Sequence, residues 1–335
     1  MLSNIKRKIA PAAYQGEKSR PVYFEGWYLK LADRAGEQLL AVIPGVFKGR
    51  DSKDSHSFIQ IFNGTTARSV YYRFPFSAFE SCSNTRFEIR IADNHFSDRH
   101  LSLNLGSGTE RITGEINFGR LNTWPCSLLS PGIMGWYTWV PFMECYHGVL
   151  SLDHEIEGRL FIGSRSVDFS RGRGYIEKDW GRAFPEAWIW LQSNHFKADQ
   201  TSFMGSIAII PWIGRPFSGF LFGLLHNDTL YRFTTYTGAR MTHLSVNEKQ
   251  VSCVVEDKEY ELAFSAPVRE GGRLYAPSAR GMTRVIRESL QSEIDVRLTQ
   301  KNKAGQQTII HDTGKNSGFE SAGDLEKLLR IREKA

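Results

Sequence analysis

The stretch LSLNL at residues 101–105 alternates leucine with a polar side chain at every step. The neighbouring stretches FEIRI at 87–91 and ITGEINF at 112–118 share this alternation. Successive side chains of a β-strand point to opposite faces, so a period of two is typical of a strand with one face on a core and one on polar surroundings. The three stretches therefore predict β-strands.

The same alternation returns at 251–255 and 293–298. Turn-forming pairs such as Asn63-Gly64 and Asn227-Asp228 separate the strand patterns at short intervals. Many short strands at roughly regular spacing are typical of sandwiches and barrels. We therefore expect an all-β protein.

A helical pattern is clearest in the tail at 321–334, where Leu325 and Leu328 fall at helical spacing. Ser321 and Asp324 stand where a capping box would begin this helix. We expect a short C-terminal helix that packs on a barrel. No GxGxxG or P-loop motif occurs in the sequence, which argues against a nucleotide-binding α/β fold.

The length of 335 residues is enough for two domains. We place their boundary near residue 183, which gives domains at 20–183 and 184–335. The four cysteines form no CxxC pair, so their spacing is neither a zinc pattern nor a dense disulfide framework. Reduced thiols in a cytoplasmic protein are the simplest interpretation.

The net charge is +6, and the basic residues are scattered, with the densest group at Lys6-Arg7-Lys8. A solvated basic surface is the favoured interpretation, and contact with anionic lipid is the alternative. No nucleic-acid-binding motif is present. The N-terminal stretch lacks the apolar core of a secretory signal, and no run of 18 apolar residues occurs. We expect a cytoplasmic protein for which peripheral membrane contact stays open.

The strongest candidate for a catalytic segment is GRGYIEKDWGRAFPEAWIWLQSNHF at 172–196, where Glu177 and Asp179 stand among tryptophans. Charged groups are rarely buried unless paired, and desolvation favours the protonated carboxyl group. A protonated acid in an apolar pocket can give its proton to an alkene. The alternative is an ion pair with Lys178, Arg173 or Arg182, with the tryptophans serving only as core.

Two further segments combine acidic, aromatic and glycine residues: YFEGWYLK at 23–30 and GWYTWVPFMECYHGVLSLDH at 135–154. Glu25 could be an acid or could pair with a nearby Lys or Arg. His147 could be a base or could form a hydrogen-bonded pair with Glu144. The spacing of the histidines and Asp153 has no partner motif, so we expect no metal and no other cofactor.

These segments resemble the tocopherol cyclase family. The likeness rests on YFEGWY at 23–28, on the pattern EKDWG…FP…W.W.Q.N.F at 177–196 and on APSARGMTRVIRESLQSEIDVRL at 276–298. It extends from about residue 20 to 315. The family is distantly similar to carotenoid hydratases and lipocalin-like proteins, which implies two lipocalin-like (calycin-type) β-barrel or sandwich domains with a lipophilic site near their contact.

The resemblance implies an acid-initiated, cofactor-independent cyclisation of a prenylated hydroquinone to a chromanol. Glu177 is the favoured acid, because plant members carry Asn at the position of Asp179, and Asp179 and Glu25 follow. His147 is the first choice of base, with Tyr28 and His195 as alternatives. The expected substrate-binding residues are Trp27, Tyr28, Trp180, Trp188, Trp190, Asn194 and His195.

Two other functions fit the same residues. A non-catalytic lipocalin-like carrier would bind isoprenoid quinones in a dry aromatic cavity without changing them. A hydratase would let water, instead of a phenol oxygen, capture the cation. In each case the expected partner is a lipophilic small molecule.

Overall fold

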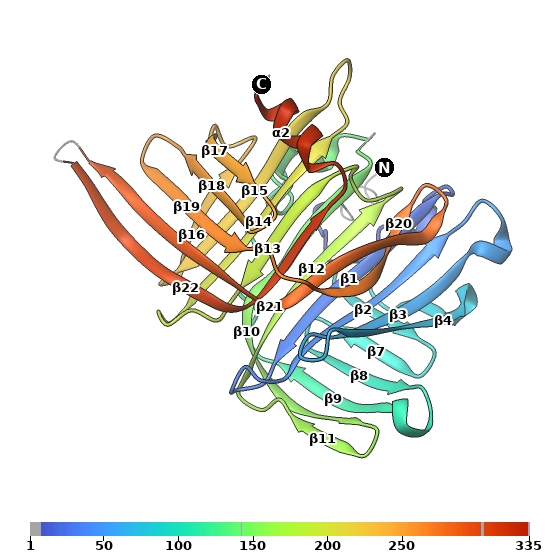
Figure 1. Cartoon of the computed structure of the whole chain (residues 1–335). Coiled ribbons are helices and arrows are strands. Elements are labelled where there is room, and N and C mark those ends of the chain that lie inside the picture. Colours follow the sequence, from blue (N-terminus) through green and yellow to red (C-terminus); the bar gives the residue numbers. More distant parts are fainter. Residues whose placement is uncertain (1–7, 142, 303–304, 334–335) are drawn as a thin grey trace. The chain divides into compact units, whose positions relative to one another are not determined.

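A computed structural model describes residues 8–141, 143–302 and 305–333 of the chain. Lys6 and Arg7 of the basic triplet lie outside the described residues. The chain divides into two compact units: the first runs to Phe184 and includes Arg273–Val285, and the second comprises Pro185–Gly272 and the chain from Ile286 onward. Each unit is built on an antiparallel sheet, which confirms the expected all-β fold (Figure 1).

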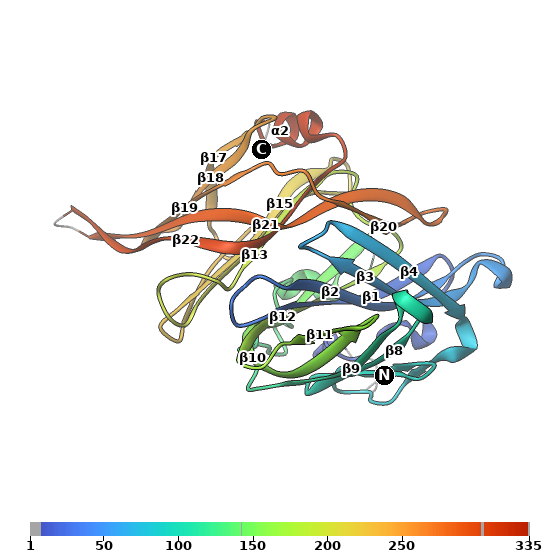
Figure 2. The ribbon, with the colours of Figure 1, turned by 60° about the horizontal axis from the view of Figure 1, so that its bottom comes forward.

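The sheet of the first unit has the strand order β4-β3-β2-β1-β12-β10-β9-β8-β7-β6-β5, with β11 paired to β10. It curls far enough that β3 contacts β6, and the short 3₁₀ helix η3 (Phe76–Ala78) links its two end strands, so the barrel is nearly closed (Figure 2). The strands are β1 Tyr23–Ala32, β2 Leu39–Lys48, β3 His56–Asn63, β4 Arg68–Pro75, β5 Phe79–Ser81, β6 Glu88–Ile91, β7 Asn94–Ser97, β8 His100–Leu105, β9 Ile112–Phe118, β10 Cys145–Ile162, β11 Arg165–Asp168 and β12 Gly172–Gly181. The other 3₁₀ helices are η1 Gly16–Lys18, η2 Ser52–Asp54, η4 Gly108–Glu110 and η5 Gly135–Trp139.

The predicted alternation explains how this barrel is filled. Leu101, Leu103 and Leu105 of β8 are buried in the core of the first unit, whereas Asn104 between them is exposed. The expected strands at 87–91, 101–105 and 112–118 are confirmed as β6, β8 and β9. Burial of the alternate side chains removes apolar surface from water, which favours this register over one shifted by a single residue.

The second sheet has the order β16-β15-β14-β13-β22-β21-β19-β18-β17, with β20 paired to β21. Its strands belong to the second unit except for Arg273–Val285, the segment of β20 and the start of β21 that groups with the first. Asn227 and Asp228, which join β15 to β16, both have positive φ (48° and 59°), as two-residue hairpin turns often require. The predicted strands at 251–255 and 293–298 lie in β18 and β21. The strands are β13 Trp188–Ser193, β14 Thr201–Ile210, β15 Phe217–His226, β16 Thr229–Thr234, β17 Arg240–Val246, β18 Gln250–Glu256, β19 Tyr260–Pro267, β20 Gly272–Ser278, β21 Gly281–Asn302 and β22 Gly305–Ala322.

The C-terminal helix α2 (Leu325–Glu333) is present, but its expected cap was wrong. Asp324 caps the helix, since its Oδ1 accepts the backbone N–H of Lys327 at 2.8 Å. Ser321 instead belongs to β22, where its pairing with Ile189 keeps it extended. The helix buries Leu328 completely in the core of the second unit.

All four cysteines carry free thiols, and Cys82 and Cys126 are exposed. Within the described ranges, no helix is long and apolar enough to span a bilayer.

Candidate active site

Strand β12 lies between β1 and β10 in the sheet of the first unit. Glu177 is paired with Tyr28 on one side and Val149 on the other, and Asp179 is paired with His147 on β10. Because side chains alternate along a strand, Glu177 and Asp179 share one face, and Lys178 between them points to the other. The three charged residues therefore divide between two different environments.

The first face carries the histidine–carboxylate cluster, which we define as His147, Glu177, Asp179 and Tyr175. His147 Nδ1 lies 2.9 Å from Asp179 Oδ1, and its Nε2 lies 3.7 Å from Glu177 Oε2. The Tyr175 hydroxyl donates a hydrogen bond of 2.5 Å to Glu177 Oε2. Among the described residues, His147 Nε2 is a buried atom without a hydrogen-bond partner. The cluster thus has one nitrogen that a ligand could engage.

Electrostatics favour a protonated His147. Burial lowers its pKa, but the charges of Asp179 and Glu177 and the hydrogen bond to Asp179 outweigh that effect and raise the pKa to about 9. At neutral pH the imidazole is therefore an imidazolium held between two carboxylates.

Two members of this face were not predicted from the sequence. Burial and the nearby Glu177 charge raise the pKa of Tyr175, so its hydroxyl keeps its proton. Cys145 places Sγ 3.8 Å from Asp179 Oδ1, and burial raises its thiol pKa as well. Tyr175 could have been found, because it stands two residues before Glu177 in the strand pattern. The position of Cys145 beside Asp179 follows from the pairing of β10 with β12, which the local sequence does not indicate.

The opposite face of β12 holds a fully buried ion pair. Lys178 Nζ lies 2.6 Å from Glu25 Oε1, and neither side chain is exposed to solvent. Lys178 also donates to the carbonyl oxygens of Pro11 and Ala13. The carboxylate of Glu25 accepts the backbone N–H of Gln15 and the Tyr23 hydroxyl. Burial lowers the pKa of Lys178, and Glu25 offsets part of that.

Two of the expected substrate-binding residues belong to this opposite face. The Lys178 ammonium lies 4.9 Å from the ring centroid of Trp27 and 4.6 Å from that of Trp180. The indole N–H of Trp27 donates to the Ala12 carbonyl. These rings therefore stabilise a cation of the protein itself. Tyr28, in contrast, stands directly opposite Glu177 in the register.

The remaining expected residues lie in the second unit. Trp188 and Trp190 are each 5% exposed and alternate with Ile189 and Leu191 of the core, so they occupy the other face of β13. Trp188 Nε1 donates to Glu320 Oε2 at 2.9 Å. The ring of Trp190 lies against Gly318, where a Cβ atom would come within 2.5 Å of it.

Asn194 and His195 follow directly after β13. Asn194 is 1% exposed, and its Oδ1 lies 2.9 Å from Nδ1 of His195. The backbone of His195 forms an isolated bridge with Lys315. Both side chains are thus fixed by local contacts within the second unit.

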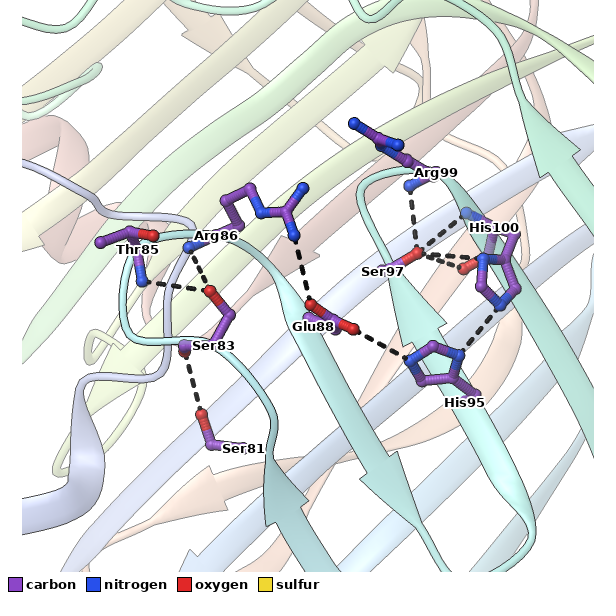
Figure 3. A network of polar contacts seen from close by, with 9 residues as sticks. All are labelled: Ser81, Ser83, Thr85, Arg86, Glu88, His95, Ser97, Arg99 and His100. Carbon is purple, nitrogen blue, oxygen red and sulfur yellow. Dashed lines mark hydrogen bonds and ion pairs between the residues drawn. The ribbon is translucent and has the colours of Figure 1, made fainter.

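A second histidine network on the barrel provides a contrast (Figure 3). His95 Nδ1 lies 2.9 Å from His100 Nε2, and its own Nε2 lies 3.8 Å from Glu88, which also faces Arg86 at 3.5 Å. Burial, His100 and Arg90 lower the pKa of His95, and Glu88 does not compensate. This histidine is neutral near pH 7, unlike His147. A pocket of about 290 Å³ elsewhere in the first unit, lined in part by Tyr14 and Lys48, shares no residue with the histidine–carboxylate cluster.

The histidine–carboxylate cluster also has the geometry of a set of metal ligands. In the described part of the chain, His147, Glu177 and Asp179 are the one group of three whose ligand atoms lie within 4.8 Å of one another. A metal ion binds neutral imidazole, so it would have to displace the proton that the carboxylates hold on His147. The carboxylate of Asp153 instead accepts two hydrogen bonds from Arg173, from Nε to Oδ1 at 2.8 Å and from Nη2 to Oδ2 at 2.5 Å. His154 is buried, and burial lowers its pKa to about 3.

Comparison with known proteins places the chain in a family. Residues 112–323 match the family model described as tocopherol cyclase-like. The rice (Oryza sativa subsp. japonica) protein "Probable tocopherol cyclase, chloroplastic" is 26% identical over 156 residues, which cover 41% of this chain and 32% of the rice protein. The match therefore spans about a third of the length of that relative.

Solved structures share the fold at low identity. CghA with Sch210972 gives a TM-score of 0.55 at 10% identity, covering 91% of this chain and 89% of CghA. An AttH-type protein from Nitrosomonas europaea gives a TM-score of 0.54 at 11% identity, covering 93% of this chain and 98% of that protein. At these identities the likeness concerns the fold alone.

Proposed function

Since the chain belongs to the tocopherol cyclase-like family, we propose that it closes an oxygen-containing ring, a cyclic ether, on a prenylated hydroquinone or a related isoprenoid phenol. Glu177 and His147 act as the acid and the base of this reaction. The observation that supports the assignment is the spacing within the cluster: His147 Nε2 lies 3.7 Å from Glu177 Oε2 and has no hydrogen-bond partner among the described residues.

The reaction conserves atoms and electrons. Glu177 gives a proton to the less substituted carbon of the alkene, and a tertiary cation forms at the other carbon. The phenol oxygen of the same molecule bonds to that cation, and His147 takes the phenol proton. A C–H and a C–O bond replace the alkene π bond and the O–H bond, and no redox partner is needed. Passage of the proton from His147 to Glu177 restores the starting state.

The resting charge distribution explains how Glu177 becomes an acid. With the pKa of His147 near 9, the proton first resides on the imidazole. An apolar prenyl tail that displaces water makes an ion pair less favourable than a neutral imidazole and a neutral carboxyl group. Substrate entry therefore shifts the proton toward Glu177. Asp179 keeps the imidazole oriented through Nδ1, and the Tyr175 hydroxyl stabilises the Glu177 carboxylate after proton delivery.

The test is incubation of the purified chain with a prenylated methylhydroquinone under reducing conditions, followed by mass analysis of the product. We expect an isomer of unchanged mass, and the Glu177→Gln variant should lose turnover by about 10³-fold, as removal of a general acid typically does. Glu88→Gln is the matched control, because Glu88 also faces a histidine (3.8 Å) but lies outside the cluster.

Other outcomes contradict the proposal in distinct ways. A product heavier by one water would identify a hydratase. Tight binding without conversion would favour a carrier. Full activity of the Glu177→Gln variant would exclude Glu177 as the acid.

A further inference from the structure

The connection between β9 and β10, residues 119–144, has an unusual composition for a surface loop. Its residues 119–143 read GRLNTWPCSLLSPGIMGWYTWVPFM, which includes three tryptophans and two adjacent leucines, and the acidic Glu144 follows directly before β10. Surface connections normally favour small and polar residues. Part of the apolar content is explained by packing, since Trp124, Ile133 and Met143 are buried.

The remaining apolar residues are exposed at the tip of this loop. Leu128 is 60% exposed and Leu129 is 82% exposed, which are high values for large apolar side chains. Trp136, in the same loop, is 46% exposed and stacks on Tyr137 with 4.1 Å between the ring centroids. Two adjacent leucines with this exposure are not accounted for by the core of the first unit.

The leucine tip is built by specific hydrogen bonds. Ser127 N donates to the Ser130 carbonyl at 3.0 Å, and Ser130 N donates to Ser127 Oγ at 3.1 Å, so a tight turn presents the two leucines at its apex. The indole N–H of Trp139 donates to the Leu128 carbonyl at 3.2 Å. These bonds satisfy backbone groups at the tip, which lowers the cost of moving it into an apolar medium.

A cation is held beside the tip. Lys8 Nζ donates to the Thr138 carbonyl at 3.2 Å and lies 5.4 Å from the ring centroid of Trp139. Within the connection itself, Arg120 near the start is the basic residue and Glu144 at the end is the acidic one. A tryptophan-rich segment with aliphatic residues at its apex and a lysine beside it has the composition that favours the interface of an anionic bilayer.

We propose that the 119–144 loop docks the protein on the surface of an anionic lipid bilayer, with Leu128 and Leu129 entering the acyl boundary. A protein partner fits less well, because two leucines and one half-exposed indole provide far less area than the roughly 800 Å² per partner of a stable protein interface. Docking is independent of the proposed reaction, since it involves no residue of the histidine–carboxylate cluster.

The test is co-sedimentation of the full chain with phosphatidylcholine vesicles, with and without phosphatidylserine. We expect binding to the anionic vesicles that weakens at high salt, since screening reduces surface attraction. The double variant Leu128→Ser, Leu129→Ser should bind about 100-fold more weakly, from about tenfold for each leucine. Phe161→Thr is the matched control: Phe161 is 46% exposed on β10 of the same unit, and its loss should leave binding unchanged.

Serine is well tolerated in turns, so the double variant should fold, and its thermal unfolding measured by circular dichroism checks this. Failure of the wild-type chain to bind either kind of vesicle would overturn the proposal. Wild-type binding by the double variant would also overturn it. A wild-type dimer in size-exclusion chromatography that the double variant abolishes would overturn the proposal as well, because the tip would then be a protein interface.

Discussion

Strand β12 carries charged side chains on both faces, and the two faces neutralise them in different ways. On one face, Lys178 and Glu25 are both completely buried, 2.6 Å apart, and surrounded by carbonyl and hydroxyl groups that complete their hydrogen bonding. On the other, His147 shares one proton with two carboxylates and keeps Nε2 without a described partner. The hydrogen-bonding capacity of the first arrangement is saturated, and that of the second is not.

This difference shows how neighbouring residues of one strand can serve structure and chemistry separately. A buried pair with complete hydrogen bonding holds one geometry and leaves no group for a ligand. A proton shared among three groups can move, and an unpartnered nitrogen can bind a substrate. Substitutions on the two faces should therefore change different measured quantities.

Lys178→Met on the saturated face should have the largest effect on stability. It leaves the Glu25 carboxylate buried without its cation, and we expect the free energy of unfolding to fall by about 3–5 kcal/mol. Urea denaturation measures this. The double variant Glu25→Gln, Lys178→Met should recover much of the loss, because it removes both charges. A single variant as stable as the wild type would show that the pair is not a structural element.

His147→Asn on the unsaturated face should affect turnover instead. We expect kcat to fall about 100-fold, as loss of a general base typically does, while the urea midpoint near neutral pH changes much less than in Lys178→Met. Assays with the prenylated methylhydroquinone measure the first quantity. His95→Asn, in the second histidine network, is the control and should keep full activity. An active His147→Asn variant would move the role of base to another residue.

The smallest expected effect is on the pH dependence of stability. The folded-state pKa of His147, about 9, lies above its ordinary value of 6.5. Its contribution is therefore complete below pH 6.5 and is lost as the pH rises through about 9.

Asp179→Asn removes one of the two carboxylates and so lowers the folded-state pKa of His147. The loss should still begin near pH 6.5, but it should end at lower pH and be smaller by on the order of 1 kcal/mol per pKa unit. Urea midpoints across this pH range, referenced to His147→Asn, measure the shift. Identical profiles for wild type and Asp179→Asn would show that Asp179 does not hold the proton. Turnover should stay within about tenfold, because Asp179 orients the imidazole rather than transferring a proton.

Much of the fold could be predicted from the sequence, because a period of two in residues such as Leu101 and Leu103 reports directly on strand geometry. The same rule places Glu177 and Asp179 on one face. It also places Trp180, three residues from Glu177, on the other face, so its position beside Lys178 was open to prediction.

Long-range pairing could not be predicted in this way. Alternation along β10 does not say which residue of β12 stands opposite His147, and that register brings the imidazole to Asp179. Nor did local patterns indicate that Arg273–Val285 groups with the first unit, where the Tyr275 backbone N–H donates to Gln60 at 2.9 Å. The prediction of Ser321 as the helix cap was wrong for a related reason, because pairing with β13 keeps this residue in a strand.

The pairing of β1 with β12 has a kinetic consequence. It joins Phe24 to Gly181, so β1 has no partner on that edge until the chain has been synthesised through β12. The hairpin at Arg273–Val285 extends this dependence, because the first unit contains residues that emerge after most of the second. Contacts of such sequence separation slow folding and leave strand edges exposed meanwhile. The two units should therefore reach their native states together during biosynthesis rather than one after the other.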